Sequence, residues 1–475
     1  MYLKFSTLTN AQNGGTLMVQ IDEKVYGNSK ERLELLFDAG TFVELGAYTR
    51  RSADAEEFEG VVCGYGAVDG KLVFAFAQDS GRTKGAFGER HAKKIAGMYS
   101  LAVKNGAPVV GIFDSAGAVV YDGASALAAY GRVMKCVSDA SGIIPQIALI
   151  DGVCGGSSAV VASMFDFAVT VKDKSKLYVN SPFIVGESAG KSDFAAASGI
   201  SAVDAESEAE AFAVVKKFIG VLPQNNAERA ISDVVYDDIN RDVAFDANDY
   251  KAAELLAQLA DNGNFVRVYE KYASNLCVGF AAFGGITAGV VASDNGGKLD
   301  ISAARAAAKM LSFCDSFGMP VVTLVDSEGL DVSLEAEGAA YAAELAKLAL
   351  AYTSSENAKV SVVLGKAYGA AFTLLGSKSV GADLAYALEG ACISVLSPEA
   401  SVAFVWNDKV GEQTREEVEA EWKEKVASAA EAADCGEIDD VIEASELRKR
   451  ICAALSMLAF KAEGDPERKH AVMPL

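Results

Sequence analysis

Histidine is almost absent from this sequence, which has two among its 475 residues, His91 and His470. A Ser-His-Asp triad needs a histidine beside its nucleophile, and a multi-histidine metal site needs several rings together. Both kinds of site are therefore nearly excluded, and we expect no metal in this chain. The sequence also lacks a P-loop, so we do not expect ATP to be activated here.

Basic residues are scarce as well. The chain has 43 lysines and arginines against 65 aspartates and glutamates, and its formal net charge is −22. A chain this acidic is a poor candidate for binding nucleic acid or anionic membranes. An anionic substrate would need a local basic patch. His91 lies in a cluster with Arg90, Lys93 and Lys94, which is either an exposed helix face or a patch that faces a phosphate.

The eight cysteines include no C-x-x-C pair, and most of them lie in apolar stretches. This pattern predicts buried free thiols in a reducing compartment. No apolar run approaches the length of about 18 residues that indicates a membrane span. The polar stretch from Met1 to Gln20 does not resemble a signal peptide. We therefore expect a cytoplasmic protein.

Glycine, by contrast, is abundant. The 44 glycines against eight prolines predict many tight turns and close backbone approaches. The stretch from Gly64 to Gly70, GYGAVDG, is close to a dinucleotide-binding fingerprint. Its spacing is wrong and no helix follows, so it predicts a β-hairpin instead.

The chain repeats itself. The stretch from Ala107 to Gly117, APVVGIFDSAG, resembles MPVVTLVDSEG from Met319 to Gly329. Three further matches follow the same order, at offsets of roughly 210 to 225 residues: GVCGGS from Gly152 with GKAYGA from Gly365, Ser181-Pro182 with Ser397-Pro398, and, more loosely, Gly40–Val43 with Gly263–Val266. Ordered matches of this kind indicate an internal duplication.

Each repeat has the same order of features: a hairpin, a helical stretch, an apolar run, an Asp-Ser loop, a second helix, another apolar run and a glycine turn. The helical stretches are Glu89 to Lys104 and Ile301 to Phe317, and the last apolar runs are Ile147 to Ile150 and Val360 to Leu364. Short apolar runs between helices predict buried, largely parallel strands with helices outside. The fold class is therefore α/β.

The length of the chain suits two domains of about 200 residues. We expect an N-terminal domain over 1–220, a connection over 221–275 and a C-terminal domain over 276–475. The connection should contain a helix near Ala252 to Leu259. After Val405 the chain becomes strongly charged and predicts a helical tail with a solvated face.

The two glycine turns are the main candidates for chemistry. A turn of small residues between a strand and a helix points backbone N–H groups into open space, where they can hold an enolate or carboxylate oxygen. Close packing of a helix on a sheet also selects small residues, and for one turn alone that interpretation would be preferred. The turn occurs twice, each time after an Asp-Ser-x-Gly loop, and this favours a functional role.

At these residues the sequence resembles the carboxyltransferase subunits of biotin-dependent acyl-CoA carboxylases and decarboxylases. The resemblance runs from about Leu35 to the C-terminus. Its most specific stretches are GGITAGVVA from Gly284, KLDISAAR from Lys298, KAYGAA from Lys366, GSK to GAD from Gly376 to Asp383, GEIDDVI from Gly436, and the closing His470 to Leu475.

The resemblance implies two tandem crotonase-like domains of the ClpP/crotonase superfamily, each a ββα spiral. It places the acyl-CoA on the N-terminal domain and biotin on the C-terminal domain. The implied oxyanion-holding amides are Gly156 and Ser157 for the thioester enolate, and Gly369 and Ala370 for the biotin ureido oxygen. The remaining candidates on the CoA side are Gly117, Ala118, Lys93, Lys94 and Gly155, and those on the biotin side are Gly329, Tyr368 and Ala371.

The family also implies partners and a mechanism. Biotin is carried by a separate carrier protein, an acyl-CoA is the substrate, and the chain forms a homo-oligomer, a dimer or a trimer of dimers. The further partner is a biotin carboxylase, or the subunits of a membrane sodium-pump decarboxylase. The reaction moves a carboxyl group between biotin and the acyl α-carbon. Because biotin carries this chemistry, no side-chain base is required.

Two departures from the family pattern concern the first half. The family's two glycines are Gly156 and Ser157 here, and its Asp-Ser-Gly-Gly-Ala-Arg loop ends in Ala118-Val119, without the arginine. Several alternatives stay open. Similarity to the decarboxylase α chains favours a methylmalonyl-CoA-type decarboxylase, and an acetyl- or propionyl-CoA carboxylase is the alternative. A CoA hydratase or isomerase and a non-catalytic scaffold are the rivals outside this chemistry.

Overall fold

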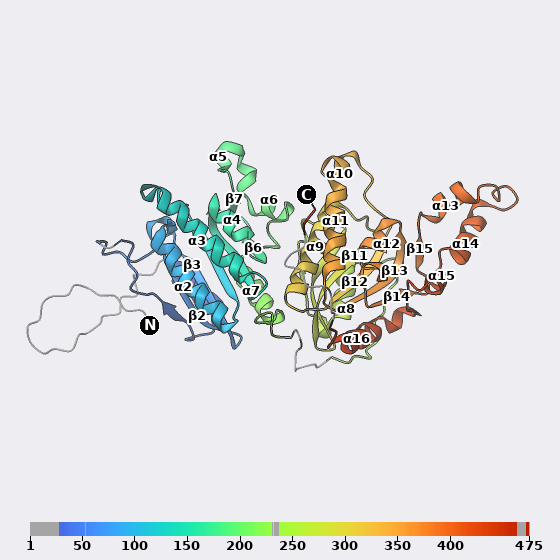
Figure 1. Ribbon diagram of the computed structural model, residues 1–475, viewed down its shortest axis with the longest axis horizontal. Helices are drawn as coiled ribbons and strands as arrows, with labels where there is room; N and C mark the ends of the chain where they lie inside the picture. The colour runs from blue at the N-terminus through green and yellow to red at the C-terminus, as the bar shows by residue number, and fades with distance from the viewer. Residues whose placement is uncertain (1–27, 53, 230, 232–236, 463–471, 475) are drawn as a thin grey trace, which may run out of the picture. The chain divides into compact units, whose positions relative to one another are not determined.

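The computed structural model describes residues 28–52, 54–229, 231, 237–462 and 472–474. They divide into two compact units, 1–220 and 221–475. Each unit is built around an eight-stranded sheet, in the order β1-β2-β3-β4-β5-β6-β8 for the first and β16-β14-β13-β12-β11-β10-β9 for the second. The eighth strand pairs off this path, β7 with β5 and β15 with β13. The two units therefore share one topology (Figure 1).

The first unit has these strands: β1 Val43–Leu45, β2 Val61–Val68, β3 Lys71–Gln78, β4 Val109–Ser115, β5 Gln146–Gly155, β6 Phe167–Val171, β7 Lys176–Tyr178 and β8 Val203–Ala205. Its helices are α1 Asn28–Leu36, α2 Glu89–Asn105, α3 Ala124–Ala140, α4 Ser157–Ser163, α5 Pro182–Val185, α6 Ser192–Ala197 and α7 Glu208–Val221. The predicted hairpin is confirmed, since β2 and β3 pair antiparallel through a turn in which Asp69 and Gly70 both have positive φ.

The second unit has these strands: β9 Phe265–Val268, β10 Leu276–Phe283, β11 Ile286–Ser293, β12 Val321–Ser327, β13 Lys359–Tyr368, β14 Leu384–Leu388, β15 Cys392–Ser394 and β16 Asp440–Ile442. Its helices are α8 Ala252–Leu259, α9 Ile301–Ser316, α10 Leu334–Gly338, α11 Tyr341–Ser354, α12 Ala370–Leu374, α13 Pro398–Val405, α14 Arg415–Lys425, α15 Ala429–Asp434 and α16 Leu447–Leu458. The stretch 221–275 contributes α8 and β9, and both elements contact β10.

The central strands are parallel and buried, as the apolar runs predict. Every residue of β4 and of β12 is buried, and each strand pairs in parallel with the next, β5 or β13. Helices α2 and α3 lie side by side in the first unit, and α9 and α11 in the second (Figure 1). Buried strands with helices packed against them are the expected α/β architecture.

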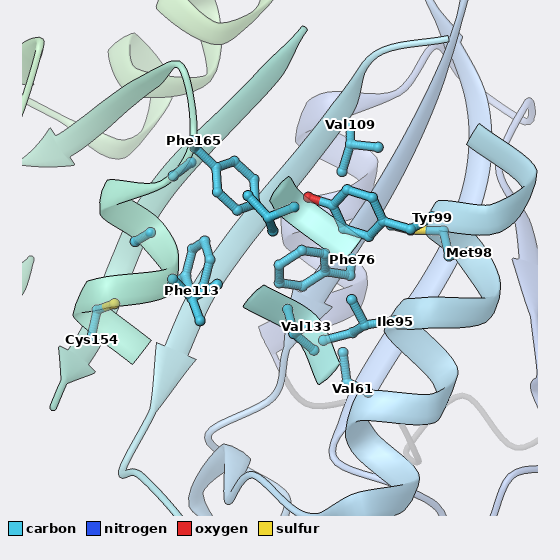
Figure 2. Close-up of a cluster of buried hydrophobic side chains, with 14 of the residues drawn as sticks. Val61, Phe76, Ile95, Met98, Tyr99, Val109, Phe113, Val133, Cys154 and Phe165 are labelled. Atoms are coloured by element: carbon cyan, nitrogen blue, oxygen red, sulfur yellow. The ribbon is translucent and has the colours of Figure 1, made fainter. Parts of the chain in front are cut away.

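A mainly hydrophobic core fills the first unit between the sheet and α2. Phe76 of β3 meets Phe113 of β4 edge-on, with ring centroids 5.3 Å apart, and Phe165 contacts both rings. Ile95 and Tyr99 of α2 point toward the same cluster (Figure 2). The second unit has a separate core, which includes Leu324 and Val362. Each sheet is therefore supported by its own buried cluster.

The described cysteines are all free, as predicted, and six of the eight are buried. Burial raises the pKa of the Cys63 thiol to about 12, so this side chain behaves as a small hydrophobic residue. Within the described ranges, no helix is both long enough and apolar enough to cross a membrane. His470 of the closing sequence motif lies outside the described residues.

Candidate active site

Both glycine turns adopt the same backbone conformation. Gly156 follows β5 with φ 60° and ψ −127°, and Gly369 follows β13 with φ 59° and ψ −143°. L-amino acids with a Cβ rarely adopt this region, so glycine is required at both turns. A Cβ placed on Gly156 would have no atom within 4 Å, which shows that the space beside this turn is open.

The amides of these two glycines are already occupied. Gly156 donates its N–H to the carbonyl of Tyr178 at 2.9 Å, and Gly369 donates to that of Ser394 at 2.9 Å. The next amides, those of Ser157 and Ala370, begin α4 and α12 and have no intrahelical acceptor. Of the two backbone N–H donors expected in each turn, the glycine N–H is therefore already used, and the remaining donors are those of Ser157 and Ala370.

A second amide in each unit comes from the loop after the preceding strand. Phe87 donates its N–H to Gly117 at 2.8 Å, and its carbonyl accepts the Val119 N–H at 2.9 Å. Ala118 lies between Gly117 and Val119 and forms a parallel β-bridge with Phe87. In such a bridge the N–H of Ala118 points away from Phe87. The Ala118 amide thus remains directed out of the loop, on the side away from that bridge.

The second unit repeats this loop. Leu299 donates to the carbonyl of Gly329 at 3.0 Å and accepts the N–H of Asp331 at 3.1 Å, so Leu330 corresponds to Ala118. The sequence pattern predicts Gly329 but not Leu330, because an apolar side chain gives no sign of a role for its backbone amide. Extending the alignment of the two repeats by one residue would have found it.

Strand register brings each loop to its glycine turn. Ser115 at the end of β4 pairs with Cys154 of β5, and Ser327 at the end of β12 pairs with Ala367 of β13. The Ala118 and Ser157 amides therefore follow neighbouring positions at the same edge of the first sheet. Leu330 and Ala370 do the same in the second sheet.

The aspartate of each Asp-Ser loop shapes the strand that enters the turn. Asp114 Oδ1 accepts the N–H of Val153 at 3.2 Å, and a Cβ on Gly152 would lie 2.1 Å from the same oxygen. Asp326 Oδ1 accepts the N–H of Lys366 at 2.9 Å. The duplicated aspartates therefore hold backbone, and they do not face a substrate as free carboxylates.

The phosphate-facing interpretation of His91 is wrong. His91 is fully buried, its Nδ1 lies 3.3 Å from Glu59 Oε1, and its ring packs against Phe87. His91 lies on the face of α2 that packs toward the core. Its charged neighbours in the sequence had suggested that this part of the helix was exposed. Burial of an imidazole between an aromatic ring and a carboxylate serves packing.

The two lysines of this cluster differ. The Lys94 side chain is buried, and its ammonium bonds Glu44 at 2.9 Å and the carbonyl of Val61 at 2.9 Å. The prediction that Lys94 binds a phosphate on the CoA side is therefore wrong. Lys93 is exposed and pairs with Glu89 at 2.7 Å on the same helix. Of the two, only Lys93 stays a candidate for the CoA side.

Three other candidates, Gly155, Ala371 and Tyr368, are involved in packing inside their units. A Cβ on Gly155 would meet the Tyr178 ring at 2.7 Å, so this glycine allows close packing. Ala371 of α12 is fully buried, so its side chain is not exposed to a ligand. Tyr368 packs with Cys392 and its neighbours in a small buried cluster, and burial raises the pKa of its phenol.

The second turn carries one feature that the first lacks. Glu328 takes the place that Ala116 has in the first loop, and it pairs with Lys366 at 2.6 Å. The bond to Glu328 raises the pKa of the Lys366 ammonium. An ion pair therefore flanks the turn of Gly369, whereas the turn of Gly156 has the uncharged residues Ala116 and Val153 at the corresponding positions. Within the described residues, no group of His, Cys, Asp and Glu is arranged to hold a metal ion.

Comparison with known proteins gives consistent matches across both units. The family model described as the carboxyl transferase domain matches residues 28–473. The α subunit of methylmalonyl-CoA decarboxylase from Veillonella parvula is 34% identical, over 94% of this chain and 93% of that protein. The mitochondrial propionyl-CoA carboxylase β chain of Homo sapiens is 32% identical, over 94% of this chain and 88% of that protein.

A solved structure agrees with this result. Transcarboxylase 12S, with methylmalonyl-CoA and methylmalonic acid bound, matches with a TM-score of 0.87 at 31% identity, over 94% of this chain and 92% of that chain. The resemblance and the duplicated crotonase-like fold expected from the sequence are thereby confirmed. Because the matches extend over both units and all their strands, the chain belongs to the carboxyl transferase family, as a biotin-dependent acyl-CoA carboxyltransferase.

Proposed function

We propose that the two turns hold the two reactants of a carboxyl transfer. The amides of Ala118 and Ser157 bind the thioester oxygen of a short acyl-CoA, and those of Leu330 and Ala370 bind the ureido oxygen of biotin on its carrier protein. The observation that carries this proposal is the pair of outward-directed amides that occurs in both units. Each pair lies beside a glycine whose backbone conformation other residues rarely adopt.

These amides suit the charge that develops in the reaction. Transfer of a carboxyl group to or from the α-carbon places negative charge on the thioester oxygen, and fixed N–H donors stabilise it without reorganisation. Biotin, when bound, would accept the carboxyl group in the decarboxylase direction, and in the carboxylase direction it would supply both that group and the base for the α-proton. The chain's own contribution is to orient both reactants and to neutralise the developing charge.

The hydratase or isomerase alternative needs a carboxylate free to act as acid or base near the turn. Asp114 is the carboxylate of the first Asp-Ser loop, and it bonds Val153 N–H, Arg32 and Ser80. A carboxylate with these partners is poorly placed to exchange protons with a substrate. This argument supports carboxyl transfer, which requires no such group.

The direction of the reaction is the finer part of the proposal. Relatives of similar identity include the Veillonella parvula methylmalonyl-CoA decarboxylase α subunit and propionyl-CoA carboxylase β chains. We propose a decarboxylase of the methylmalonyl-CoA type, with the propionyl-CoA carboxylase reaction as the second candidate. Identification of the subunits that co-purify with the chain decides between them, because a biotin carboxylase indicates carboxylation and an integral membrane decarboxylase indicates the reverse.

Oligomerisation belongs to the same proposal. The transcarboxylase 12S structure is described as a hexamer assembly. In this chain, large apolar side chains are exposed after β4 and around α5 in the first unit, and after β12 and around α13 in the second: Val120, Tyr121, Phe183, Ile184, Val332, Leu334, Val395 and Phe404. Exposed apolar groups at matching places in both repeats are typical of surfaces buried between copies.

The test uses the purified chain with free biotin and methylmalonyl-CoA or malonyl-CoA. We expect slow, biotin-dependent release of CO2 from one of these thioesters. Absence of turnover with every short malonyl-type thioester favours a scaffold. Rapid exchange of the acyl-CoA α-proton without biotin favours the hydratase or isomerase chemistry.

A further inference from the structure

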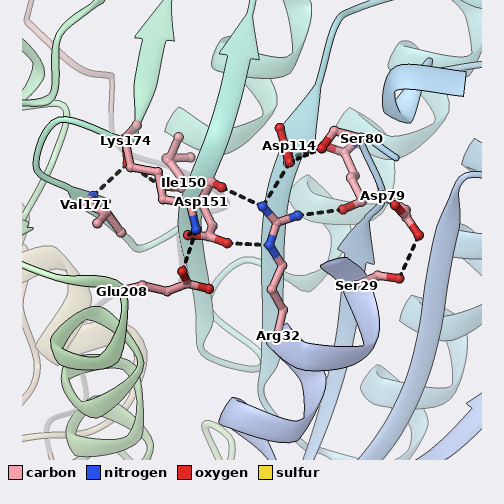
Figure 3. Close-up of polar contacts among 12 residues, drawn as sticks. Ser29, Arg32, Asp79, Ser80, Asp114, Ile150, Asp151, Val171, Lys174 and Glu208 are labelled. Atoms are coloured by element: carbon pink, nitrogen blue, oxygen red, sulfur yellow. Dashed lines mark hydrogen bonds and ion pairs between the residues drawn. The ribbon is translucent and has the colours of Figure 1, made fainter. Parts of the chain in front are cut away.

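A buried arginine joins the strands that lead to the acyl-side turn. Arg32 of α1 is 2% exposed, and its Nη2 bonds Asp114 Oδ2 at 2.9 Å and the main-chain carbonyl of Asp151 at 2.6 Å (Figure 3). Its Nη1 bonds the carbonyl of Gln78 at 3.0 Å, and its Nε bonds the Asp151 carboxylate. One guanidinium thus contacts β3, β4 and β5.

Asp151 extends this contact across the unit. The residue is fully buried, and its second carboxylate oxygen pairs with Lys174 at 2.6 Å. Lys174 also pairs with Glu208 of α7 at 2.6 Å (Figure 3). The charges therefore alternate from α1 through β5 to α7, and each buried carboxylate has a cationic partner.

Arg32 lies at an irregularity in the strand pairing. Phe113 pairs with Ile150, but Ser115 pairs with Cys154, so the three residues 151–153 stand opposite Asp114 alone. The extra residues lead directly into the Gly156 turn. The contacts of Arg32 with Asp114 and Asp151 span this irregularity and fix both of its sides.

The second repeat builds the same irregularity without these ions. Val325 pairs with Val363 and Ser327 with Ala367, as in the first unit. The residue that corresponds to Asp151 is Leu364, which is buried, and the phenol of Tyr250 lies 3.4 Å from Asp326. Burying charged groups costs desolvation free energy, and the second repeat forms the same strand irregularity without this ion cluster. This contrast indicates a role for the cluster beyond folding.

We propose that Arg32 and Asp151 are positioning residues for the acyl-CoA reaction. By holding Asp114 and the 151–153 segment together, they fix the spacing between the Ala118 and Ser157 amides that bind the thioester oxygen. The proposal rests on the oxyanion role of these amides. Because the amides act on charge that develops in the transition state, loosening them lowers kcat and leaves KM for the acyl-CoA nearly unchanged.

The first experiment replaces Asp151 by the residue of the other repeat. For Asp151→Leu and Asp151→Asn we expect kcat for biotin-dependent decarboxylation of methylmalonyl-CoA to fall by about 10- to 100-fold. The KM for methylmalonyl-CoA of each variant should stay within about twofold of the wild-type value. Arg32→Lys should also lower kcat, because an ammonium cannot bond two carboxylates and two carbonyls in one plane. Glu44→Gln is the control, since it breaks another buried ion pair of the same unit, with Lys94, away from β4 and β5.

Hydrogen exchange supplies a readout that does not depend on activity. In Asp151→Asn the amides of residues 114–118 and 151–158 should exchange faster, while those of α2 stay unchanged. Wild-type kcat in both Asp151 variants, with Ser157→Pro inactive, overturns the positioning role. If Ser157→Pro is itself active, the oxyanion assignment fails, and faster exchange confined to the two loops still supports the positioning of these segments.

Discussion

At the scale of single residues, the proposed site consists of backbone N–H groups, which side-chain identity alone does not reveal. The sequence predicted the glycines at 156 and 369, because small residues after an apolar run are visible in it. It could not predict that both glycine amides are used by the carbonyls of Tyr178 and Ser394, since those bonds depend on strands β7 and β15. The free donors became identifiable only with the tertiary pairing.

Removing one N–H tests this assignment. Proline is tolerated at the first position of a helix, and Gly156 has no Cβ for the ring to meet, so Ser157→Pro should fold. We expect the loss of this single oxyanion donor to reduce kcat by about 100- to 1,000-fold, measured as biotin-dependent decarboxylation. Ser157→Ala keeps the amide and should retain activity. Equal loss in both variants would assign the effect to the hydroxyl, and wild-type activity in Ser157→Pro would remove the amide from the site.

Gly152 offers a matched pair of glycine substitutions. A Cβ at this position would lie 2.1 Å from Asp114 Oδ1, inside the Arg32 cluster, so Gly152→Ala should destabilise the first unit by about 2 kcal/mol or more. Gly131 lies on the exposed side of α3 with no atom within 4 Å of such a Cβ, so Gly131→Ala should stabilise it by about 0.5–1 kcal/mol. Urea unfolding measures both changes, and equal effects would contradict the packing described here.

At the scale of elements, periodicity and apolar runs predicted most of the strands and the long helices. The helix expected from Ala252 to Leu259 is α8 with the same bounds, and the one expected from Glu89 to Lys104 ends one residue later, at Asn105. The orientation of α2 was the harder part. Its charged residues surround a buried histidine, and only the packing of the helix on the sheet decides which of them face solvent.

One ion pair between helices gives a pH prediction. Glu344 of α11 bonds Arg305 of α9 at 2.9 Å and Lys347 at 2.9 Å, and these bonds, Arg305 first, lower the pKa of Glu344 to about 2. A carboxylate whose folded pKa lies below its unfolded value of about 4.3 stabilises the fold above that value, and the contribution disappears as pH falls toward 2. Arg305 is half exposed, so solvent limits the contribution to about 1 kcal/mol.

The measurement compares wild type with Glu344→Gln by urea unfolding at several pH values. At pH 6 the variant should be less stable by about 1 kcal/mol, and the difference should shrink steadily as the pH falls from about 4.5 through 3, which is the upper part of the interval between the unfolded pKa and the folded pKa of about 2. A difference that stays constant over this range would show that the carboxylate acts through shape and not through its charge.

At the scale of the whole molecule, the duplication was readable because its matches keep their order, whereas the different electrostatics of the two repeats were not. Asp151 and Leu364 align in the sequence, but nothing in the sequence places Arg32, from a helix outside the repeated core, against one of them. The two halves therefore share a backbone and differ in what supports it. The first unit has a buried ion cluster on the strands that lead to its turn, and the second unit has an exposed Lys366–Glu328 pair beside its turn.

Separate cores predict separate stability. The first unit is built around a buried cluster that includes Phe76 and Phe113, and the second around one that includes Leu324 and Val362, each with its own sheet. A domain with its own core is able to fold by itself, so a fragment of residues 28–220 should unfold cooperatively in urea. Gly152→Ala should lower the midpoint of this fragment as it does in the whole chain, whereas Glu344→Gln should leave the first-unit transition of the whole chain unchanged. A fragment without a cooperative transition, or a response of both units to either substitution, would show that the two cores are stabilised as one.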